Sequence, residues 1–499
     1  MAIPEDLRIP ATGHVHPDVV ATFAVEGHLA RADLQRAAGG RQELARDPAS
    51  DPLKVGRHVV HTADLHGAAE PSPAQKTFRP WHGRQLRGKG LPGRVKAGTV
   101  GARRVRVCIA LHADLFEPWP IVRPMFEARV LRRLGREVCV YSWIKDPASP
   151  LAQEEIRDGL RIRRRKLAPP RGFFSRVLGF RRMSKDFAAE IASLRPDAIL
   201  SHDLEMLWAS VLAGRSLHVP VLYHAHEDWP AMVSERSRLE GFVFGFLEHR
   251  LLKSVDHVYA AGEERAERFR RMGKAVTVIY GAKSLSEIPR ITDHDRASIR
   301  AAAGFRPEDV VLGIAGSLGR DEAVPAVLEA MASLAPHVKL YVVGGGDAKV
   351  TDAMALAAAR GLSGRVLFTG RLPTPEYLRK TAALDLGLAL YFPTTKNQTT
   401  VVPLKLFDYM GLGIPILGSD FPELRRILLE TCACGAVTDP ADAAAIRGAI
   451  QDLIADPNRL REMGRRAREG FATLYCQERQ EEALLRSHLI FAGGSRPAG

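Results

Sequence analysis

From Val105 onward the sequence alternates short aliphatic runs with longer amphipathic segments, and this alternation limits the fold more than any other feature. The first aliphatic runs lie at 105–111, 137–143 and 198–203, and helical patterns separate them. Strands that are separated by helices of ten or more residues pair in parallel through crossover connections. The pattern therefore predicts an α/β protein with doubly wound parallel sheets.

Two such series follow one another along the 499 residues, which is enough chain for two or three domains. Further strands are expected at 219–226, 257–261 and 276–280 in the first series, and at 310–316, 338–343, 366–369, 386–390, 414–417 and 435–437 in the second. A polar connector is expected at 282–307, and terminal helices at 441–455, 457–474 and 477–491. We expect four parts: an extension (1–100), two Rossmann-like domains (101–285 and 286–475), and a C-terminal helix with a tail (476–499) that packs back on the first domain.

The first 100 residues differ from the rest, because they are rich in Ala, Gly, Pro, His and Arg and contain few aliphatic runs. Weak helices are expected near Pro17–Ala38. The stretch Glu70–Gly98 is basic and rich in Pro and Gly, a composition that does not bury enough apolar surface to fold. We therefore expect the extension to be largely disordered.

The sequence also predicts a location. It contains no run of about eighteen apolar residues, so no transmembrane helix is expected. Its N-terminus lacks the basic and apolar regions of a secretory signal. Five cysteines are scattered without metal-ligand spacing. We expect a cytoplasmic protein, peripheral at the inner face of the membrane if its basic segments bind lipid.

The formal net charge of +14 is concentrated in two stretches, Arg79–Arg106 and Arg161–Lys185, neither of which contains an acid. Aromatic and aliphatic residues interleave with the second stretch. This mixture suits an anionic membrane surface or a phosphorylated acceptor, with Arg176, Arg181 and Arg182 as contact residues. A solvated basic loop explains the same pattern. No nucleic-acid-binding motif is present, and no nucleic acid is expected.

The stretch Pro403–Asp420 reads as a short helix that ends at glycine, a tight turn and a buried strand. Lys405 and Asp408 lie one turn apart on a face other than that of Leu404. This arrangement would hold a lysine and a carboxylate beside the edge of a parallel sheet where α/β folds bind ligands. An ordinary αβ unit with a surface ion pair is the alternative.

Two glycine-rich turns follow strands of the second series, at 316–320 and 344–346. Gly316 and Gly319 precede a helix, whose backbone N–H groups and positive end favour a phosphate. The turn is not a G-x-G-x-x-G sequence, so the dinucleotide fingerprint fails. A plain tight turn is the alternative for both.

Taken together, these segments resemble the retaining GT-B glycosyltransferases related to family 4, over about residues 101–492. The resemblance rests on Pro196–Asp203, Tyr223–Asp228, Thr369–Pro373 with Ala383–Leu386, and Lys405–Pro415, which follow the family's order and spacing. It implies a nucleoside diphosphate sugar as donor, bound mainly by the second domain, and an acceptor bound by the first. It implies no cofactor and no metal.

The same resemblance implies the site residues. The implied donor-binding residues are Gly316, Gly319, Arg320, Arg371, Thr400, Leu404, Lys405 and Asp408. His226 matches a strand-end histidine near the transferred sugar, and Asp408 matches the acid that holds the donor's ribose; both are expected to be catalytic. Arg123 is expected on the acceptor side.

The chain also departs from the family pattern. The first acid of the family's E-x7-E motif is replaced by Thr400, and Asp408 is one methylene shorter than the usual glutamate. Pro325 stands where a basic residue is usual, and Pro403 offers no N–H to a phosphate. These departures leave two hypotheses, a retaining glycosyltransferase with a lipid-linked or anionic acceptor, and a non-catalytic GT-B protein that binds a nucleotide, glycan or protein.

Overall fold

The computed structural model describes residues 104–116, 122–170, 172–319, 321–345, 348–400 and 402–489. Two expected features lie outside the described residues: the extension (1–100) with its weak helices, and, in the second half, Arg320. The domain boundaries at 100, 285 and 475 stay predictions.

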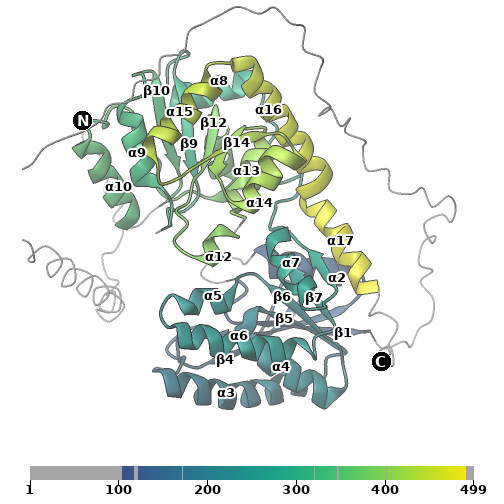
Figure 1. The fold of residues 1–499 in the computed structure, drawn as a ribbon. Coiled ribbons are helices and arrows are strands. Elements are labelled where there is room, and N and C mark those ends of the chain that lie inside the picture. Colours follow the sequence, from purple (N-terminus) through teal and green to yellow (C-terminus); the bar gives the residue numbers. More distant parts are fainter. Residues whose placement is uncertain are drawn as a thin grey trace, which may run out of the picture. The chain divides into compact units, whose positions relative to one another are not determined.

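The first sheet contains eight strands in the order β3-β4-β2-β1-β5-β6-β7-β8 (Figure 1). All neighbouring strands pair in parallel except β3 and β4, which pair antiparallel. The strands are β1 (Arg106–Leu111), β2 (Glu137–Ile144), β3 (Glu154–Arg157), β4 (Leu160–Lys166), β5 (Ala198–His202), β6 (Val221–Ala225), β7 (His257–Ala260) and β8 (Val276–Val278).

Helices pack on both faces of this sheet, because successive strand residues point to opposite sides. Cys108 and Ala110 of β1 pack on one side with α3, α4 and α6, whereas Val107 and Ile109 pack on the other with α2 and α17. The helices of this half are α2 (Val122–Arg133), α3 (Phe173–Ser193), α4 (Asp203–Leu217), α5 (Trp229–Ser234), α6 (Arg238–Leu252) and α7 (Glu263–Arg271), joined by the C-terminal α17 (Gln477–Leu489).

The second sheet has six parallel strands in the order β11-β10-β9-β12-β13-β14. They are β9 (Val310–Ala315), β10 (Val338–Val343), β11 (Val366–Phe368), β12 (Leu386–Ala389), β13 (Ile416–Ser419) and β14 (Gly435–Thr438). The helices are α8 (Asp293–Ala302), α9 (Val324–Ala332), α10 (Ala348–Ala359), α11 (Thr374–Thr381), α12 (Lys396–Thr399), α13 (Leu404–Leu412), α14 (Pro422–Arg425), α15 (Ala443–Ile454) and α16 (Pro457–Gly470), with π-helical turns η1 (Arg426–Thr431) and η2 (Phe471–Tyr475).

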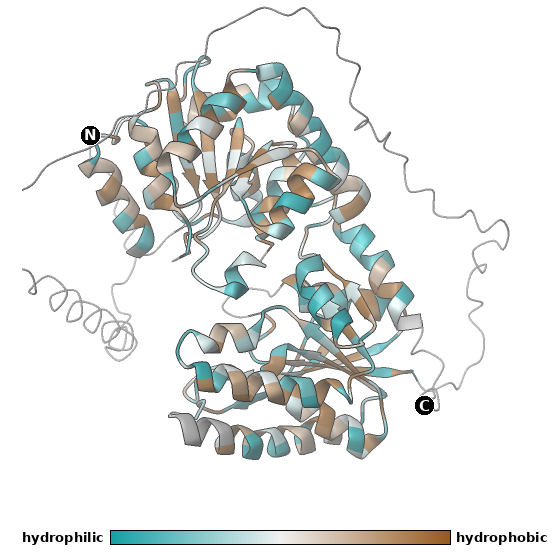
Figure 2. Cartoon of the chain, viewed as in Figure 1, coloured by the Kyte–Doolittle hydropathy of each residue, from teal (hydrophilic) through white to brown (hydrophobic). Residues whose placement is uncertain are grey.

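Both sheets follow the hydropathy pattern that predicted them. In Figure 2 the strands are mainly hydrophobic, while the helices carry both hydrophobic and hydrophilic residues. Two doubly wound α/β sheets in sequence confirm the expected fold class. No helix among the described residues is long and apolar enough to cross a membrane.

One expectation, the polar connector, and one alternative, the solvated basic loop, differ from the structure. The connector 282–307 contains the helix α8, which begins with a capping box between Thr292 and Asp295. The basic stretch that starts at Arg161 is not a loop up to residue 166, because 160–166 form the strand β4. Polar character misled in both places, since caps and cross-strand ion pairs let polar segments form regular structure.

Candidate functional site

His226 directly follows β6, at the carboxyl edge of the first sheet. Because β1, β5 and β6 are parallel neighbours, their carboxyl ends bring His112, His202 and His226 to the same edge. In open α/β sheets this edge is where ligands bind. The structure thus places the expected histidine at the expected edge, in a group of histidines.

Asp203 holds the backbone after β6 in place. It lies in the left-handed region with φ 55°, which aspartate tolerates better than most residues. Its Oδ1 accepts hydrogen bonds from the backbone N–H groups of His226 (2.8 Å) and Glu227 (3.3 Å), and its Oδ2 contacts His112 Nε2 at 3.2 Å. A single buried carboxylate therefore joins the ends of β1, β5 and β6.

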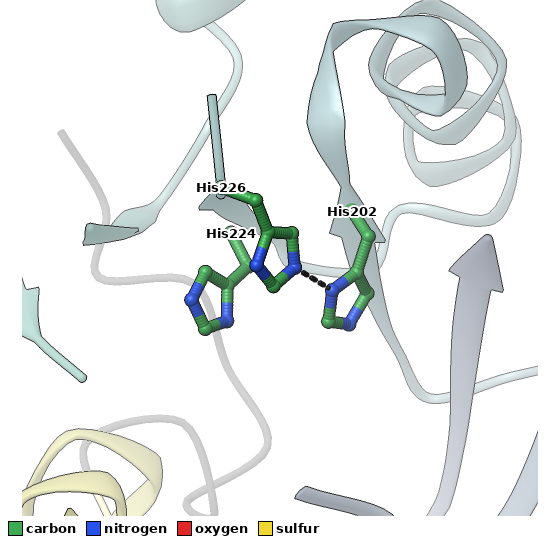
Figure 3. Close-up of side chains that lie close together, drawn as sticks. All are labelled: His202, His224 and His226. Carbon is green, nitrogen blue, oxygen red and sulfur yellow. Dashed lines mark hydrogen bonds between the residues drawn. The ribbon is translucent and has the colours of Figure 1, made fainter. Parts of the chain in front are cut away.

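Three histidines, His202, His224 and His226, lie together at this edge (Figure 3); Glu127 joins them, and all but the partly buried His226 are buried. His202 Nδ1 lies 2.7 Å from His226 Nε2. Glu127 of α2 is fully buried; its Oε1 lies 2.5 Å from His224 Nδ1, and its Oε2 lies 3.0 Å from His202 Nε2. The last contact is an ion-pair contact, since neither of its two atoms has a hydrogen-bond partner among the described residues. The His224 and His226 rings stack, with centroids 4.2 Å apart and 11° between their planes.

Burial and neighbouring charges shift the pKa values in this cluster. Burial, followed by the neighbouring His224, His202 and Arg123, lowers the pKa of His226 well below its ordinary value. Burial also lowers the pKa of His224, against the opposing effect of Glu127. Burial alone would raise the pKa of Glu127, but His224 and His202 outweigh it and lower that pKa. The cluster at neutral pH therefore contains an ionised Glu127 and neutral His224 and His226.

Two arginines contact the group around His226. Arg123 of α2 places Nη1 3.2 Å from His226 Nδ1, and Arg265 of α7 donates a hydrogen bond to the His226 backbone carbonyl. Arg123 was expected on the acceptor side or at a membrane; the structure places it against His226. A Cβ at Gly281 would come within 3.1 Å of Arg123 Nε and 2.6 Å of Leu404 Cδ2, so glycine leaves room for both side chains.

In the second half, Lys405 is buried and its Nζ lies 2.6 Å from Oε1 of the buried Glu322. It also lies 5.5 Å from the ring centroid of Tyr391. Gly316 has φ 92°, and a Cβ there would lie 3.7 Å from Lys405 Cε. Gly316 and Lys405, expected at the donor site, are therefore neighbours at the carboxyl end of β9.

Asp408 is buried too, and both of its carboxylate oxygens are engaged. Lys283 Nζ lies 2.5 Å from one oxygen, and the Tyr377 hydroxyl donates to the other at 3.0 Å. Burial and the Asp408 charge raise the pKa of Tyr377 well above its ordinary value, which keeps the phenol protonated. The alternative of a surface ion pair between Lys405 and Asp408 is wrong, because each is buried with another partner.

Asn397 and Thr400 connect the second half to the residues after β6 and to α7. Asn397 Oδ1 accepts from the Asp228 backbone N–H (2.8 Å) and from Arg265 (3.0 Å), and its Nδ2 donates to Glu227 (2.8 Å). Thr400, which replaces the family's first acid, lies 3.4 Å from Arg265 through its hydroxyl. The Thr400 hydroxyl also donates to the Asn397 carbonyl at 3.0 Å, so it joins an arginine of the first half to α12.

Other expected site residues are exposed to solvent or lie outside the described residues. Gly319, Arg371 and Leu404 are exposed. Arg181 and Arg182 are exposed on α3, while the side chain of Arg176 lies outside what the structure describes. Arg320, the residue expected at the diphosphate, also lies outside the described residues.

Two arginines of β4, Arg163 and Arg164, pair closely with acids, whereas Arg161 and Arg165 are half-exposed. Arg164 has a fully buried side chain that pairs with Asp114 and, at 2.6 Å, with Glu155. Arg163 pairs with Glu154 of β3 at 2.5 Å. The acids that neutralise this run come from the adjacent strand and from another loop, so the run without acids in sequence is neutralised in space.

The sequence reasoning missed Glu127, Arg265, Lys283, Glu322 and Asn397. Glu127 had a usable signal, because it lies among Phe126, Val130 and Leu131 on the apolar side of a predicted helix. A carboxylate on a core-facing position requires buried partners. The other four had no local signal, since 39 positions separate Arg265 from His226 and 83 or more separate the other three from their partners.

Two domain families match the chain. Residues 120–280 match the glycosyl transferase 4-like domain, and residues 295–470 match the glycosyl transferases group 1 family. Together they cover more than half of the chain; the first spans the strands of the first sheet except β1, and the second spans all strands of the second sheet.

Curated relatives are similar over part of the chain. A GDP-mannose-dependent alpha-(1-6)-phosphatidylinositol monomannoside mannosyltransferase of Mycolicibacterium smegmatis is 24% identical over 55% of this chain and 73% of its own length. A D-inositol 3-phosphate glycosyltransferase of Nocardia farcinica is 26% identical over 41% of this chain. A putative teichuronic acid biosynthesis glycosyltransferase of Bacillus subtilis is 22% identical over 42%. The chain spans about half the length of the last two.

Solved structures share the fold. A sucrose-phosphate synthase of Thermosynechococcus elongatus superposes with a TM-score of 0.64 at 19% identity, covering 79% of this chain and all of that one. Anabaena HepE in complex with UDP-glucose superposes with a TM-score of 0.58 at 16% identity, covering 78% of this chain and all of that one. At these identities the likeness shows the fold alone.

Proposed function

Because this chain belongs to the group 1 glycosyltransferases and has their GT-B fold, we propose that it moves a sugar from a nucleoside diphosphate donor to a hydroxyl acceptor with retention of configuration. Sugar transfer is the reaction class of the family. The donor, the stereochemical course and the acceptor are our proposal. The observation that carries it is the meeting of Gly316 and Lys405, with Asp408 one turn further along α13, at the carboxyl edge of the second sheet.

In the proposed reaction the bond between the anomeric carbon and the diphosphate oxygen breaks. The acceptor oxygen forms its bond to that carbon on the same face, and its proton passes to the departing phosphate. The reaction then needs no base from the protein. What the protein supplies is positioning and positive charge where the diphosphate develops charge.

The proposed diphosphate site uses the turn after β9. Gly316, in the left-handed region, directly follows β9 and lies beside Lys405. Arg320 comes four positions later in the sequence. An ammonium has three N–H donors, so the bond to Glu322 leaves two on Lys405. The proposal needs no metal and no cofactor, because arginine and lysine carry the charge that the phosphates require.

Asp408 is proposed to hold the ribose of the donor. Its carboxylate is bonded to Lys283 and Tyr377 in the structure, so a ribose hydroxyl would add to or replace one of these bonds. His226 is proposed to lie near the transferred sugar, because it stands at the carboxyl edge of the first sheet. The acceptor would then approach from the residues that surround His226 and Arg123.

Binding of nucleoside diphosphates tests the proposal first. We expect calorimetry of the full chain with UDP, GDP and ADP, each alone and with its sugar, to show micromolar preference for one base, about −8 kcal/mol of binding free energy. Asp408→Asn should weaken this binding, whereas exposed Asp452→Asn should not. If a folded sample binds none of the nucleotides, the non-catalytic hypothesis replaces the enzyme.

Turnover separates transfer from binding. Arg320→Ala should lower the release of nucleoside diphosphate by about a hundredfold or more, since an arginine that stabilises a leaving phosphate contributes on that scale. Exposed Arg379→Ala serves as the control. Unchanged turnover in Arg320→Ala would remove Arg320 from the proposed site.

We also propose that the acceptor is lipid-linked or anionic and that the protein binds peripherally to the cytoplasmic face of a membrane, within glycan or polysaccharide biosynthesis. Support comes from helices α3 and α6. They are neighbours, because the ring centroids of Phe180 on α3 and Phe244 on α6 lie 6.0 Å apart. Exposed apolar and basic residues alternate on both, namely Leu178, Arg181, Arg182 and Lys185 on α3, and Arg238, Leu239, Phe242, Phe246 and Arg250 on α6. This combination suits anionic lipid headgroups.

Vesicle co-sedimentation tests the membrane proposal. We expect binding to vesicles of phosphatidylcholine with phosphatidylglycerol, and little to phosphatidylcholine alone. The variant with Arg176, Arg181 and Arg182 changed to Glu should bind at least about tenfold more weakly, since each basic residue near a membrane contributes about 1 kcal/mol. Arg459→Glu with Arg461→Glu, exposed in the second half, is the control. Unchanged vesicle binding would contradict the proposal.

A further inference from the structure

The hydrogen bonds in the cluster behind His226 run in one direction, because one end of the cluster can only donate and the other can only accept. At one end is Arg123, whose guanidinium has only N–H donors. At the other end is Glu127, whose ionised carboxylate only accepts. Between them stand His226 and His202; an imidazole that carries a single proton has one donor and one acceptor nitrogen.

These constraints leave one arrangement of protons. His226 Nδ1 faces Arg123 at 3.2 Å and must therefore accept, so the His226 proton is on Nε2. His226 Nε2 then donates to His202 Nδ1 at 2.7 Å, and the proton of His202 is on Nε2, 3.0 Å from Glu127. His224 donates from Nδ1 to the other Glu127 oxygen. Its Nε2 is buried without a hydrogen-bond partner among the described residues.

We propose that Glu127 and His202 are positioning residues for sugar transfer: they hold His226 in its Nε2–H form, so that its Nδ1 lone pair orients the guanidinium of Arg123 toward the substrate. Arg123 is then the substrate-facing end of this chain of hydrogen bonds, and it donates a hydrogen bond to an oxygen of the substrate. Its Nε is buried beside Gly281, so the substrate contact is proposed for the Nη groups of the guanidinium. This inference rests on the proposed function only in naming the substrate as a sugar donor or acceptor.

A metal site is the competing interpretation, because ring nitrogens of His202, His224 and His226 lie within 4.8 Å of one another. The His202 and His226 rings lie 15° from parallel with centroids 5.0 Å apart, and their facing nitrogens are 2.7 Å apart (Figure 3). A zinc ion bonded to both at about 2.0–2.1 Å in a tetrahedral site would hold these nitrogens more than about 3 Å apart. It would also require a proton on His226 Nδ1, facing the Arg123 donor. The geometry is therefore that of a hydrogen-bonded chain.

Nitrogen NMR of the full chain, labelled at histidine, reads the proposed protons directly. We expect His226 at neutral pH to show a protonated Nε2 and an unprotonated Nδ1, assigned from the spectrum of His226→Asn. In His202→Phe the Nε2–H group has no acceptor and only Arg123 still favours this tautomer, so the population of the Nε2–H form should fall. In His202→Asn the side-chain oxygen can accept from His226 Nε2, so the tautomer should be retained.

Turnover and nucleotide affinity separate positioning from a structural role. Release of nucleoside diphosphate from UDP-glucose or GDP-mannose should fall about tenfold to a hundredfold in His202→Phe, the range expected on losing a second-layer partner, and should largely recover in His202→Asn. The affinity for the nucleoside diphosphate alone should not change, because the chain lies in the first half. Glu248→Gln is the matched control, since Glu248 is fully buried in the same half but pairs with Tyr223 and Arg268.

Each arm has its own contradicting result. A protonated His226 Nδ1 in the unaltered protein would overturn the inference, even if nucleotides bind and turnover is seen. Stoichiometric binding of zinc that removes the His226 signals would also overturn it, in favour of a metal site. If no nucleotide binds, the proposed function fails, and the NMR result still decides whether the chain of protons exists. Equal loss of turnover in His202→Phe, His202→Asn and Glu248→Gln would reduce the chain to a structural role.

Discussion

At the scale of single residues, ionisable groups at the edge of the first sheet shift one another's pKa values. His112 lies against Asp203 and Glu205 from α4 and against Lys145, which follows β2. Burial lowers the pKa of His112, but the hydrogen bond that His112 donates to Asp203 and the two carboxylate charges outweigh burial and Lys145, so the pKa is raised. The residue is therefore more protonated in the folded chain than in the unfolded one.

This raised pKa predicts a dependence of stability on pH. A group whose pKa is higher in the folded state stabilises that state below its unfolded value of about 6.5, and the stabilisation is lost as pH rises through the folded value. The difference in unfolding free energy between the unaltered protein and His112→Gln should therefore be larger near pH 6 than near pH 8.5. Urea unfolding at both pH values measures it, with exposed His249→Gln as control. A difference that grows with pH would contradict the assignment.

The buried pair of Arg164 makes a second prediction at this scale. Its side chain is fully buried against Asp114 and Glu155, so Arg164→Ala leaves carboxylates without their cation. We expect a loss of about 3–5 kcal/mol in the free energy of unfolding, as for other broken buried pairs. Arg161→Ala, with a half-exposed side chain 3.9 Å from Glu154, should cost less than about 1 kcal/mol. Denaturant unfolding compares them, and equal costs would contradict the role of Arg164.

At the scale of elements, caps and pairing decide where polar sequence becomes regular structure. The α8 helix forms in a stretch expected to be a connector, because its first turn closes on itself. The Thr292 hydroxyl accepts from the Asp295 backbone N–H at 3.1 Å, and Asp295 accepts from the Thr292 backbone N–H at 2.9 Å. Ile299 then anchors the helix in the core of the second half.

The capping box predicts the cost of removing it. Thr292→Ala should lower the free energy of unfolding by about 1 kcal/mol, the usual cost of losing a threonine cap. Thr374→Ala is the control, because Thr374 is an exposed first residue of α11, whose N-terminus has no side-chain cap. Thermal unfolding of both variants provides the comparison. A larger loss in Thr374→Ala would contradict the importance of the cap.

At the scale of the whole described chain, buried side chains of one half satisfy backbone groups of the other. Glu423 of α14 is fully buried and accepts from the backbone N–H groups of Glu263 (3.2 Å) and Glu264 (3.0 Å), at the start of α7. It also accepts from Tyr280 and Arg426. A carboxylate at a helix N-terminus supplies acceptors where the helix has unpaired donors.

Removing this carboxylate should expose the start of α7 to solvent exchange. In Glu423→Ala the amides of Glu263 and Glu264 lose their acceptors, so we expect faster hydrogen–deuterium exchange in peptides that contain them. Peptides from α4, in the same half, should keep their rates. Exposed Glu430→Ala is the control. Unchanged exchange at 263–264 in Glu423→Ala would show that α7 does not depend on Glu423.

Much of the fold could be predicted because parallel sheets are built from strands that are buried on both faces. Strands such as 338–343 and 198–202 therefore appear as apolar runs, and their bounds were predicted within a few residues. The hairpin of β3 and β4 could not be recognised in this way. Its arginines and glutamates neutralise one another across strands, and that pairing leaves no apolar signal.

The candidate site, like the fold, could be predicted from the sequence only in part. The alternation of strands and helices, with family motifs at their ends, was enough to predict the GT-B fold and to place His226, Gly316 and Lys405 at sheet edges. Which groups face them was decided by the tertiary structure. Glu127 contacts His202 and His224 from α2, a helix far earlier in the chain. Asp408 contacts Lys283, which precedes the first strand of the second sheet. Hydropathy is a local property of the chain, whereas hydrogen-bond partners depend on which sheet edges the crossovers bring together.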